Sequence, residues 1–187
     1  MEPDTATVPP PLGTRADTGP GDTERVLDSS VPLIALARDA HGLLIDEFAN
    51  RHGHHFLVRG NQQSRDDFLE LANDSRQGPP PPLFDTWVYR IACETGRVTI
   101  GRGAGCDLRV TDNTIAAIHA TLDFSGETPT VRDHGSTYGT WVGFDLAEPQ
   151  TATEVPIDRA ISFGLVPLVM VPAPTLVKVL RQVFANV

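Results

Sequence analysis

Basic residues, cysteines and long apolar runs are all scarce in this sequence. Its 187 residues include 15 Lys and Arg against 24 Asp and Glu, a net charge of −9, which argues against sequence-independent attraction to nucleic acid or to an anionic membrane. The chain has no stretch of about 18 apolar residues and no basic segment followed by an apolar run at its start, so we expect neither a membrane span nor a signal peptide. These absences predict a cytoplasmic protein with no nucleic-acid partner and no membrane partner.

Cysteine is represented only by Cys93 and Cys106. Both fall at inward-facing positions of predicted strands, which suits reduced core thiols better than a secreted disulfide framework, while a single bridge between the two stays open. Hydrophobic residues make up 40% of the chain. This is enough for a sizeable core, and we expect one main core.

The first 30 residues are rich in Pro, Gly, Thr and Asp and carry more acidic than basic side chains. Such a segment buries too little apolar surface to offset its ordering entropy, so residues 1–30 are predicted to form a disordered acidic tail. Its threonines are open to phosphorylation and to use as an internal ligand, although a plain solubilising tail is the favoured interpretation.

Residues 31–76 are predicted to form a helical extension. Apolar residues at spacings of three and four predict an amphipathic helix over about 31–52, and residues 55–59 have the pattern of a short strand. A second, short helix follows a capping box that opens at Ser64. These elements are too small to hold a core alone, so we expect their apolar faces to pack on the β-domain, on a partner or on each other.

A Pro-rich linker over residues 77–85 is interpreted as a domain boundary rather than as a ligand for an aromatic groove. Between 86 and 172, short runs of alternating apolar and polar residues are separated by turns, the pattern of half-buried strands. Seven to ten such strands indicate a β-sandwich. An apolar stripe at helical spacing then predicts a C-terminal helix within residues 173–187.

The most distinctive loops lie between Arg97 and Phe144. They carry Gly101-Arg102, Ile118-His119 and the run Gly135-Ser136-Thr137-Tyr138-Gly139-Thr140. In this order and spacing the motifs resemble the forkhead-associated (FHA) domain, over roughly residues 87–172. The resemblance implies a sandwich that presents loops from one end to phosphothreonine peptides. The predicted fold is therefore a mainly β, FHA-like β-sandwich of about eleven short strands with an N-terminal helical extension and a C-terminal helix.

The FHA family pattern is Gly-Arg, then Ser-x-x-His, then Ser-x-Asn-Gly-Thr. Arg102 matches the loop arginine, whose guanidinium is suited to charge-assisted hydrogen bonds with phosphate, and Thr137 matches a hydroxyl position beside the phosphate. The resemblance further implies a group of residues that support the loops: Gly101, His119, Gly139 and Thr140.

Three positions depart from this pattern. Ala116 stands where the family has a phosphate-binding serine, Ala117 where a second basic or polar contact is common, and Tyr138 where an asparagine holds the peptide backbone. One lost hydrogen bond to a charged group costs about 1.5–3 kcal/mol, so losing two or three would weaken phosphopeptide binding by more than about a hundredfold. The apolar replacements suit a protein-binding surface without phosphate. The candidate phosphopeptide or partner-binding residues are Arg102, Ala116, Ala117, Thr137 and Tyr138.

Other chemistries fit the sequence less well. The glycines after Ile100 suggest a nucleotide loop, but a predicted strand follows them instead of a helix, and there is no Walker lysine. Ingredients of a hydrolytic triad are present without a nucleophile elbow; they are His119, Asp133, His134 and Ser136. The histidines between positions 41 and 55 lack the cysteine or spaced carboxylate that would complete a zinc site.

We therefore predict a non-enzymatic protein-protein interaction module with no cofactor and no bound metal. The favoured function is a scaffold or adaptor that binds a protein partner largely without phosphate. One alternative is a weak phosphothreonine-peptide reader in Ser/Thr kinase signalling that uses Arg102 and Thr137. A hydrolase using His119 and Ser136 is a further alternative, and pairing with Asp112 is the plain structural role for Arg102.

Overall fold

The structure is a computed structural model that describes residues 29–81, 83, 85–91, 96–157 and 159–185. The predicted tail up to residue 28 and Cys93 lie outside the described residues.

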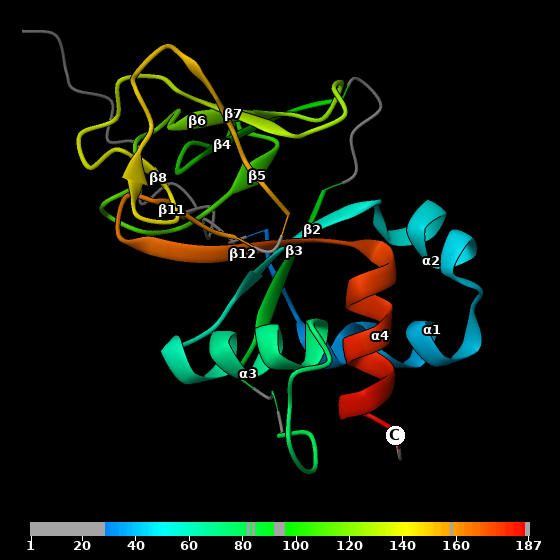
Figure 1. Ribbon diagram of the computed structural model, residues 1–187. Helices are drawn as coiled ribbons and strands as arrows, with labels where there is room; N and C mark the ends of the chain where they lie inside the picture. The colour runs from blue at the N-terminus through cyan, green and yellow to red at the C-terminus, as the bar shows by residue number, and fades with distance from the viewer. Residues whose placement is uncertain (1–28, 82, 84, 92–95, 158, 186–187) are drawn as a thin grey trace, which may run out of the picture.

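Two β-sheets face each other, and helices cover the outer face of the larger sheet (Figure 1). Within the described residues the larger sheet has seven strands in the order β1-β3-β2-β12-β11-β8-β9. These strands are β1 (Val31–Pro32), β2 (His55–Arg59), β3 (Trp87–Ile91), β8 (Thr140–Val142), β9 (Asp145–Leu146), β11 (Ala160–Phe163) and β12 (Val166–Pro172).

The smaller sheet, in the part of the chain that the structure describes, has five strands in the order β10-β7-β6-β4-β5. They are β4 (Arg97–Gly101), β5 (Leu108–Arg109), β6 (Ala120–Asp123), β7 (Thr130–Asp133) and β10 (Ala152–Glu154). Strands β4 and β5 are parallel, and β4 pairs with β6 in the antiparallel sense. The predicted β-sandwich with helices at both ends of the chain is confirmed.

The helical elements come from both ends of the chain and from the connection between β2 and β3. They are a 3-10 helix η1 (Leu33–Leu36), α1 (Ala37–Gly42), α2 (Ile45–His52), α3 (Gln62–Ala72) and α4 (Ala173–Val183). The continuous helix expected over 31–52 is wrong. The chain enters as strand β1, and the backbone is extended at Leu43 and Leu44, where the Glu47 carboxylate accepts the Leu44 N–H and restarts the helix as α2.

Strand β2 lies between β3 and β12, so a segment expected in the helical extension forms an interior strand of the larger sheet. It pairs with β3 along residues 55–59 and with β12 along 55–58. Both neighbours are antiparallel to it. The residues between β2 and β3 form α3 and the proline-rich connection, which loops out below the sheet in Figure 1.

The larger sheet separates two hydrophobic cores. On its inner face Leu57, Tyr89 and Met170 pack against the smaller sheet. On its outer face Val58 and Val171 pack against the helices. Because successive side chains of a strand point to opposite faces, β2 and β12 are apolar at consecutive positions. The helical elements thus complete the fold by covering one face of a sheet that is buried on both sides.

Two local expectations fail. Cys106 was expected to face inward on a strand, but it lies in the loop before β5, half-buried, and its free thiol donates to the carbonyl oxygen of Ala117. Ser64 was expected to open the second helix, but Asn61 is the N-cap, and its side chain accepts the Ser64 N–H at 2.8 Å. In both cases the apolar pattern was right and the element boundary was displaced by two or three residues.

No helix within the described ranges has the length and apolar character needed to cross a membrane.

Candidate functional site

Three loops meet at the end of the sandwich where β4 ends. The loop after β4 is held to the loop before β6 by two backbone hydrogen bonds, from Arg102 N–H to the Ala116 carbonyl and from Gly103 N–H to the Ala117 carbonyl, both 2.9 Å. Gly101 is required for this approach, because a Cβ there would lie 2.3 Å from the Ala117 carbonyl oxygen. The first two loops therefore form one rigid unit. We call these two loops and the loop between β7 and β8 the apical loops.

His119 connects this unit to the third loop. Its buried ring accepts the Ala116 N–H at Nδ1, at 3.1 Å, and donates from Nε2 to the Gly139 carbonyl oxygen, also at 3.1 Å. The ring also meets Phe163 edge-on. Burial lowers the pKa of His119, and the Gly139 hydrogen bond and the nearby Asp133 carboxylate only partly oppose this effect. A neutral ring with its proton on Nε2 fits both hydrogen bonds.

Asp133 shapes the third loop. One of its buried carboxylate oxygens accepts the backbone N–H groups of Gly135 and Ser136, and the other accepts the hydroxyl groups of Ser136 and Thr140. Burial raises the pKa of Asp133, but the hydrogen bonds to Thr140, Ser136 and Gly135 outweigh it and leave a net lowering. Sequence reasoning treated Asp133 only as a possible triad member. Its position at the end of β7, just before the glycine turn, is the signal that could have identified it as the residue that accepts hydrogen bonds from this loop.

The predicted partner-binding residues all lie on the apical loops. Arg102, Ala117, Thr137 and Tyr138 are exposed, and Ala116 is half-buried. The Arg102 side chain lies against the second loop, with Nε donating to the Ile115 carbonyl oxygen at 3.3 Å. Asp112 instead accepts the N–H and hydroxyl of Thr114. Among the described residues Arg102 is therefore not paired with Asp112.

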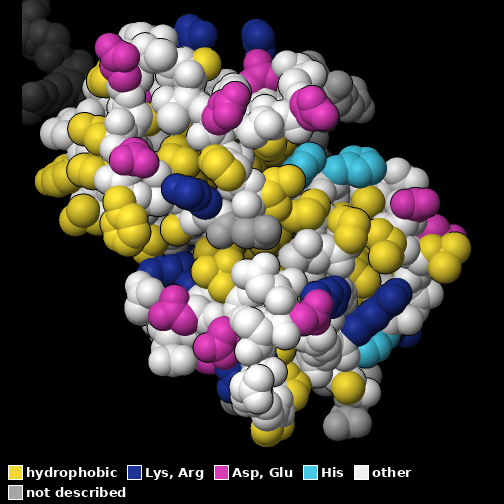
Figure 2. All heavy atoms as spheres, viewed as in Figure 1, with side chains coloured by type: hydrophobic (Ala, Val, Ile, Leu, Met, Phe, Trp, Pro, Cys, Tyr) yellow, Lys and Arg dark blue, Asp and Glu magenta, His cyan; other side chains and the backbone are white. Residues whose placement is uncertain are grey.

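An exposed apolar surface continues from Tyr138 along the β8–β9 hairpin. Trp141 and Leu146 are direct partners across β8 and β9, and the Trp141 indole N–H donates to the Tyr138 carbonyl oxygen at 3.3 Å. Phe144 stands at the tip of the hairpin. We call Tyr138, Trp141, Phe144 and Leu146 the aromatic patch. Figure 2 shows hydrophobic side chains gathered in this region, at the left of the upper part of the molecule, where Figure 1 places β8.

The residues of the suggested hydrolytic triad do not form one. The Ser136 hydroxyl donates to Asp133 at 2.7 Å, and both nitrogens of His119 are engaged by backbone groups. His134 faces another residue, with Nε2 at 2.8 Å from the Thr121 hydroxyl. A serine nucleophile needs a base within hydrogen-bond reach, and this geometry does not provide one at Ser136.

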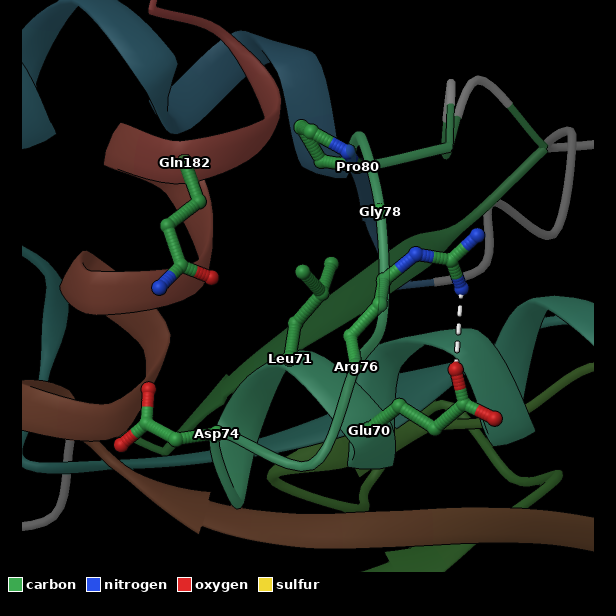
Figure 3. Close-up of a pocket in the computed structure, with 7 residues that line it drawn as sticks. All are labelled: Glu70, Leu71, Asp74, Arg76, Gly78, Pro80 and Gln182. Carbon is green, nitrogen blue, oxygen red and sulfur yellow. Dashed lines mark hydrogen bonds and ion pairs between the residues drawn. The ribbon is translucent and has the colours of Figure 1, made fainter.

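The His, Cys, Asp and Glu side chains that the structure describes include no group of three placed to hold a metal ion. A pocket of about 280 Å³ lies elsewhere, between the end of α3, the connection that follows and α4 (Figure 3). Its charged lining residues are already paired: Arg76 contacts Glu70 at 3.0 Å, and Asp74 pairs with Lys178. None of the apical-loop residues lines it.

Residues 98–164, which span β4 to the turn after β11, match the family model of the FHA domain. The chain contains an FHA domain. FHA domains are phosphopeptide-binding protein interaction modules. The matched segment includes all three apical loops and excludes β2, β3 and β12, which belong to the larger sheet.

Solved FHA structures are similar to the chain at low sequence identity. An FHA domain from a Chlamydia trachomatis protein is 16% identical, with 63% of this chain and 96% of that chain covered and a TM-score of 0.42. EmbR of Mycobacterium tuberculosis, solved with a low-affinity phosphopeptide, is 13% identical, with 63% of this chain and 24% of that chain covered and a TM-score of 0.43. No curated protein matches the sequence.

Proposed function

We propose that this FHA domain serves an adaptor or scaffold that binds a protein partner through its apical loops, largely without phosphate. The observation that carries the proposal is the chemistry beside Arg102. Ala116 and Ala117 provide no side-chain hydroxyl or amide, and Tyr138 continues into the aromatic patch. The loops keep their supports, so the frame is retained while the polar contacts to a phosphate are reduced.

Some polar side chains of the apical loops already form hydrogen bonds within the loops. The Ser136 hydroxyl donates to Asp133, and Arg102 Nε donates to a backbone carbonyl. The exposed aromatic side chains of the patch are among the residue types that are enriched at protein-protein interfaces. A partner without phosphate would gain more from this apolar surface than from the remaining polar groups.

A weak phosphothreonine reader is the second candidate. It is favoured by the exposed positions of Arg102 and Thr137 on neighbouring loops. A guanidinium and one hydroxyl could together donate some of the hydrogen bonds that a phosphate group accepts. In this case the protein would act within Ser/Thr kinase signalling. Either function is compatible with the predicted cytoplasmic location and with the prediction that the protein has no nucleic-acid or membrane partner.

Binding of paired peptide libraries, phosphothreonine and unmodified, separates these candidates. Fluorescence polarisation would be measured with the wild-type chain, with Arg102→Ala and with Arg132→Ala, a matched loss of an exposed arginine on β7. The adaptor proposal expects unmodified peptides to bind as well as phosphorylated ones. Binding that requires phosphate and is lost in Arg102→Ala, but not in Arg132→Ala, would overturn it in favour of the phosphothreonine reader.

A further inference from the structure

The aromatic patch is unusually exposed for a set of neighbouring large apolar side chains. Tyr138 is 51% exposed, Trp141 37%, Phe144 99% and Leu146 56%. Leu146 lies directly over Gly139, where a Cβ would come within 2.5 Å of its Cδ1. Contiguous exposed apolar side chains of this kind mark interaction sites. The helices that cover the rest of the outer face pack against β2, β3 and β12, so β8 and β9 remain outside that cover.

The chain itself carries a segment whose chemistry fits such a surface. Residues 8–12 read Val-Pro-Pro-Pro-Leu. Consecutive prolines favour the polyproline II conformation, which is already extended before binding and docks on grooves lined by aromatic side chains. We propose that residues 8–12 of the tail dock on the aromatic patch of the same molecule.

The position of Ser29 makes this contact geometrically accessible. Ser29 pairs with Arg109 at the edge of β5, through Ser29 N–H to the Arg109 carbonyl and Arg109 N–H to the Ser29 hydroxyl, both 3.0 Å. The Arg109 side chain in turn donates to the Arg102 carbonyl oxygen at 3.2 Å. The tail therefore joins the described structure beside the apical loops, and the third of these loops leads into the patch.

The connecting length is sufficient. Sixteen residues lie between Leu12 and Ser29, and a connection of this length spans at most about 60 Å and has a root-mean-square length of about 23 Å. A domain of this size is roughly 40 Å across, so every point of the patch lies within reach. Tethering of this kind gives an effective concentration of about 1 mM, so an intrinsic Kd of about 0.1 mM would keep the patch about nine-tenths covered.

The second proline run does not compete for the patch. Pro79 accepts a hydrogen bond from Arg76, and Pro80 lines the pocket between α3 and α4 (Figure 3), on the side of the larger sheet away from the smaller one.

The charges beside the aromatic patch and beside the proline run of the tail are opposite in sign. Arg159 lies against Gly143 of the β8–β9 hairpin, and the acidic residues Glu2 and Asp4 precede the proline run.

Docking would limit access to the apical loops, because Tyr138 belongs both to the patch and to the proposed partner-binding surface. This consequence rests on the proposed function. A partner would have to displace the tail. The partner's apparent Kd would equal its intrinsic Kd divided by the fraction of molecules in which the patch is uncovered.

Acrylamide quenching of Trp141 fluorescence tests the docking itself. The full chain would carry Trp87→Phe, so that Trp141 is the one remaining tryptophan. In this background the triple substitution of Pro9, Pro10 and Pro11 by Ala should increase the quenching constant about twofold, since it destroys the polyproline II segment. Substitution of Pro3 and Pro20 by Ala, elsewhere in the tail, should leave the constant unchanged.

The increase should not depend on protein concentration, because the ligand is tethered. Equal quenching in all three proteins, or an equal effect of the control substitutions, would overturn the proposal. An effect that grows with protein concentration would assign the contact to the tail of a second copy, and the intramolecular proposal would be wrong. The measurement contains no partner, so its failure would leave the adaptor function standing.

Discussion

His119 and Gly139 are joined by a 3.1 Å hydrogen bond from the buried imidazole Nε2 to the Gly139 carbonyl oxygen. Because the other ring nitrogen accepts the Ala116 N–H, one side chain sets the spacing between the loop that carries Ala116 and the loop that carries Tyr138. Any ligand that contacts both loops depends on this spacing. The site is thus organised by a residue that is fully buried and that contacts the backbone of both loops.

His119→Ala should lower the free energy of unfolding by about 2–4 kcal/mol, since it leaves two backbone groups unpaired and opens a cavity. Urea denaturation would measure the loss. The control is His134→Ala, which removes an exposed imidazole that contacts only the Thr121 hydroxyl among the described contacts, and its effect should stay below about 1 kcal/mol. Similar losses in the two variants would contradict a supporting role specific to His119.

Stability should fall as the pH drops from about 7 to about 5. Burial lowers the pKa of His119 and also that of His55, so the unfolded chain takes up protons near its ordinary histidine pKa of about 6.5 while the folded chain does not. Protonation then favours the unfolded state, and the loss begins as the pH falls through about 6.5. The aspartates with lowered pKa values, such as Asp133, act only below about pH 4.

Thermal unfolding at several pH values would measure this dependence. His119→Gln and His55→Gln each remove one titrating ring, so each should flatten the curve between pH 7 and 5, and the double variant should flatten it most. A wild-type stability that stays constant or rises toward pH 5 would show that the folded state does not keep these histidines neutral.

Gly101→Ala should destabilise the apical loops, because the added methyl group would lie 2.3 Å from the Ala117 carbonyl oxygen and 2.7 Å from Cys106 Sγ. Overpacking of this kind costs about 1–3 kcal/mol. Gly105→Ala is the matched control in the same loop, since nothing lies within 4 Å of its Cβ position. Chemical denaturation of both variants should show a clear loss for the first only, and equal midpoints would refute the close approach.

Restoring the family side chains should recover phosphate-dependent binding. Ala116→Ser combined with Tyr138→Asn adds a hydroxyl beside Arg102 and an amide on the third loop. With about 1.5–3 kcal/mol for each hydrogen bond to a charged group, affinity for phosphothreonine peptides should rise at least about tenfold. Fluorescence polarisation with phosphorylated and unmodified peptides would measure the gain, and adding Arg102→Ala should abolish it. A double variant that binds no better than wild type would mean that the loops do not hold the family geometry.

The local motifs were predictable because they depend on short spacings. The glycine at 101, the histidine at 119 and the glycine at 139 stand at turns and contacts whose residue types the chemistry restricts, so the order of motifs located the loops. The placement of residues 55–59 was not predictable in the same way. Their apolar pattern indicated a strand, but nothing local shows which strands it pairs with, because pairing is decided by contacts distant in the sequence.

The helical layer was the other unpredicted feature. Amphipathic helices were expected from the spacing, but whether they covered the sandwich or a partner stayed open. The consecutive apolar residues of β12, from Leu168 to Val171, are the signal that could have decided it, because a strand buried on both faces requires a layer on each side. Their alternation between the two cores now shows where that second layer lies.

A chain reduced to residues 86–172 should fail to fold. It keeps every apical loop and every strand expected in the sandwich, but it lacks β2, which separates β3 from β12 and pairs with both. Without β2, the inward-facing Leu57 is lost from one core, and Val169 and Val171 lose the helices that cover them. Circular dichroism and thermal melts should show no cooperative transition for this fragment.

The control is a fragment of residues 29–187, which keeps β2 and all the helices and should melt within a few degrees of the full chain. If the shorter fragment melted cooperatively near the same temperature, the helical layer and β2 would be dispensable additions, and the boundary at the proline-rich linker would be a true domain boundary.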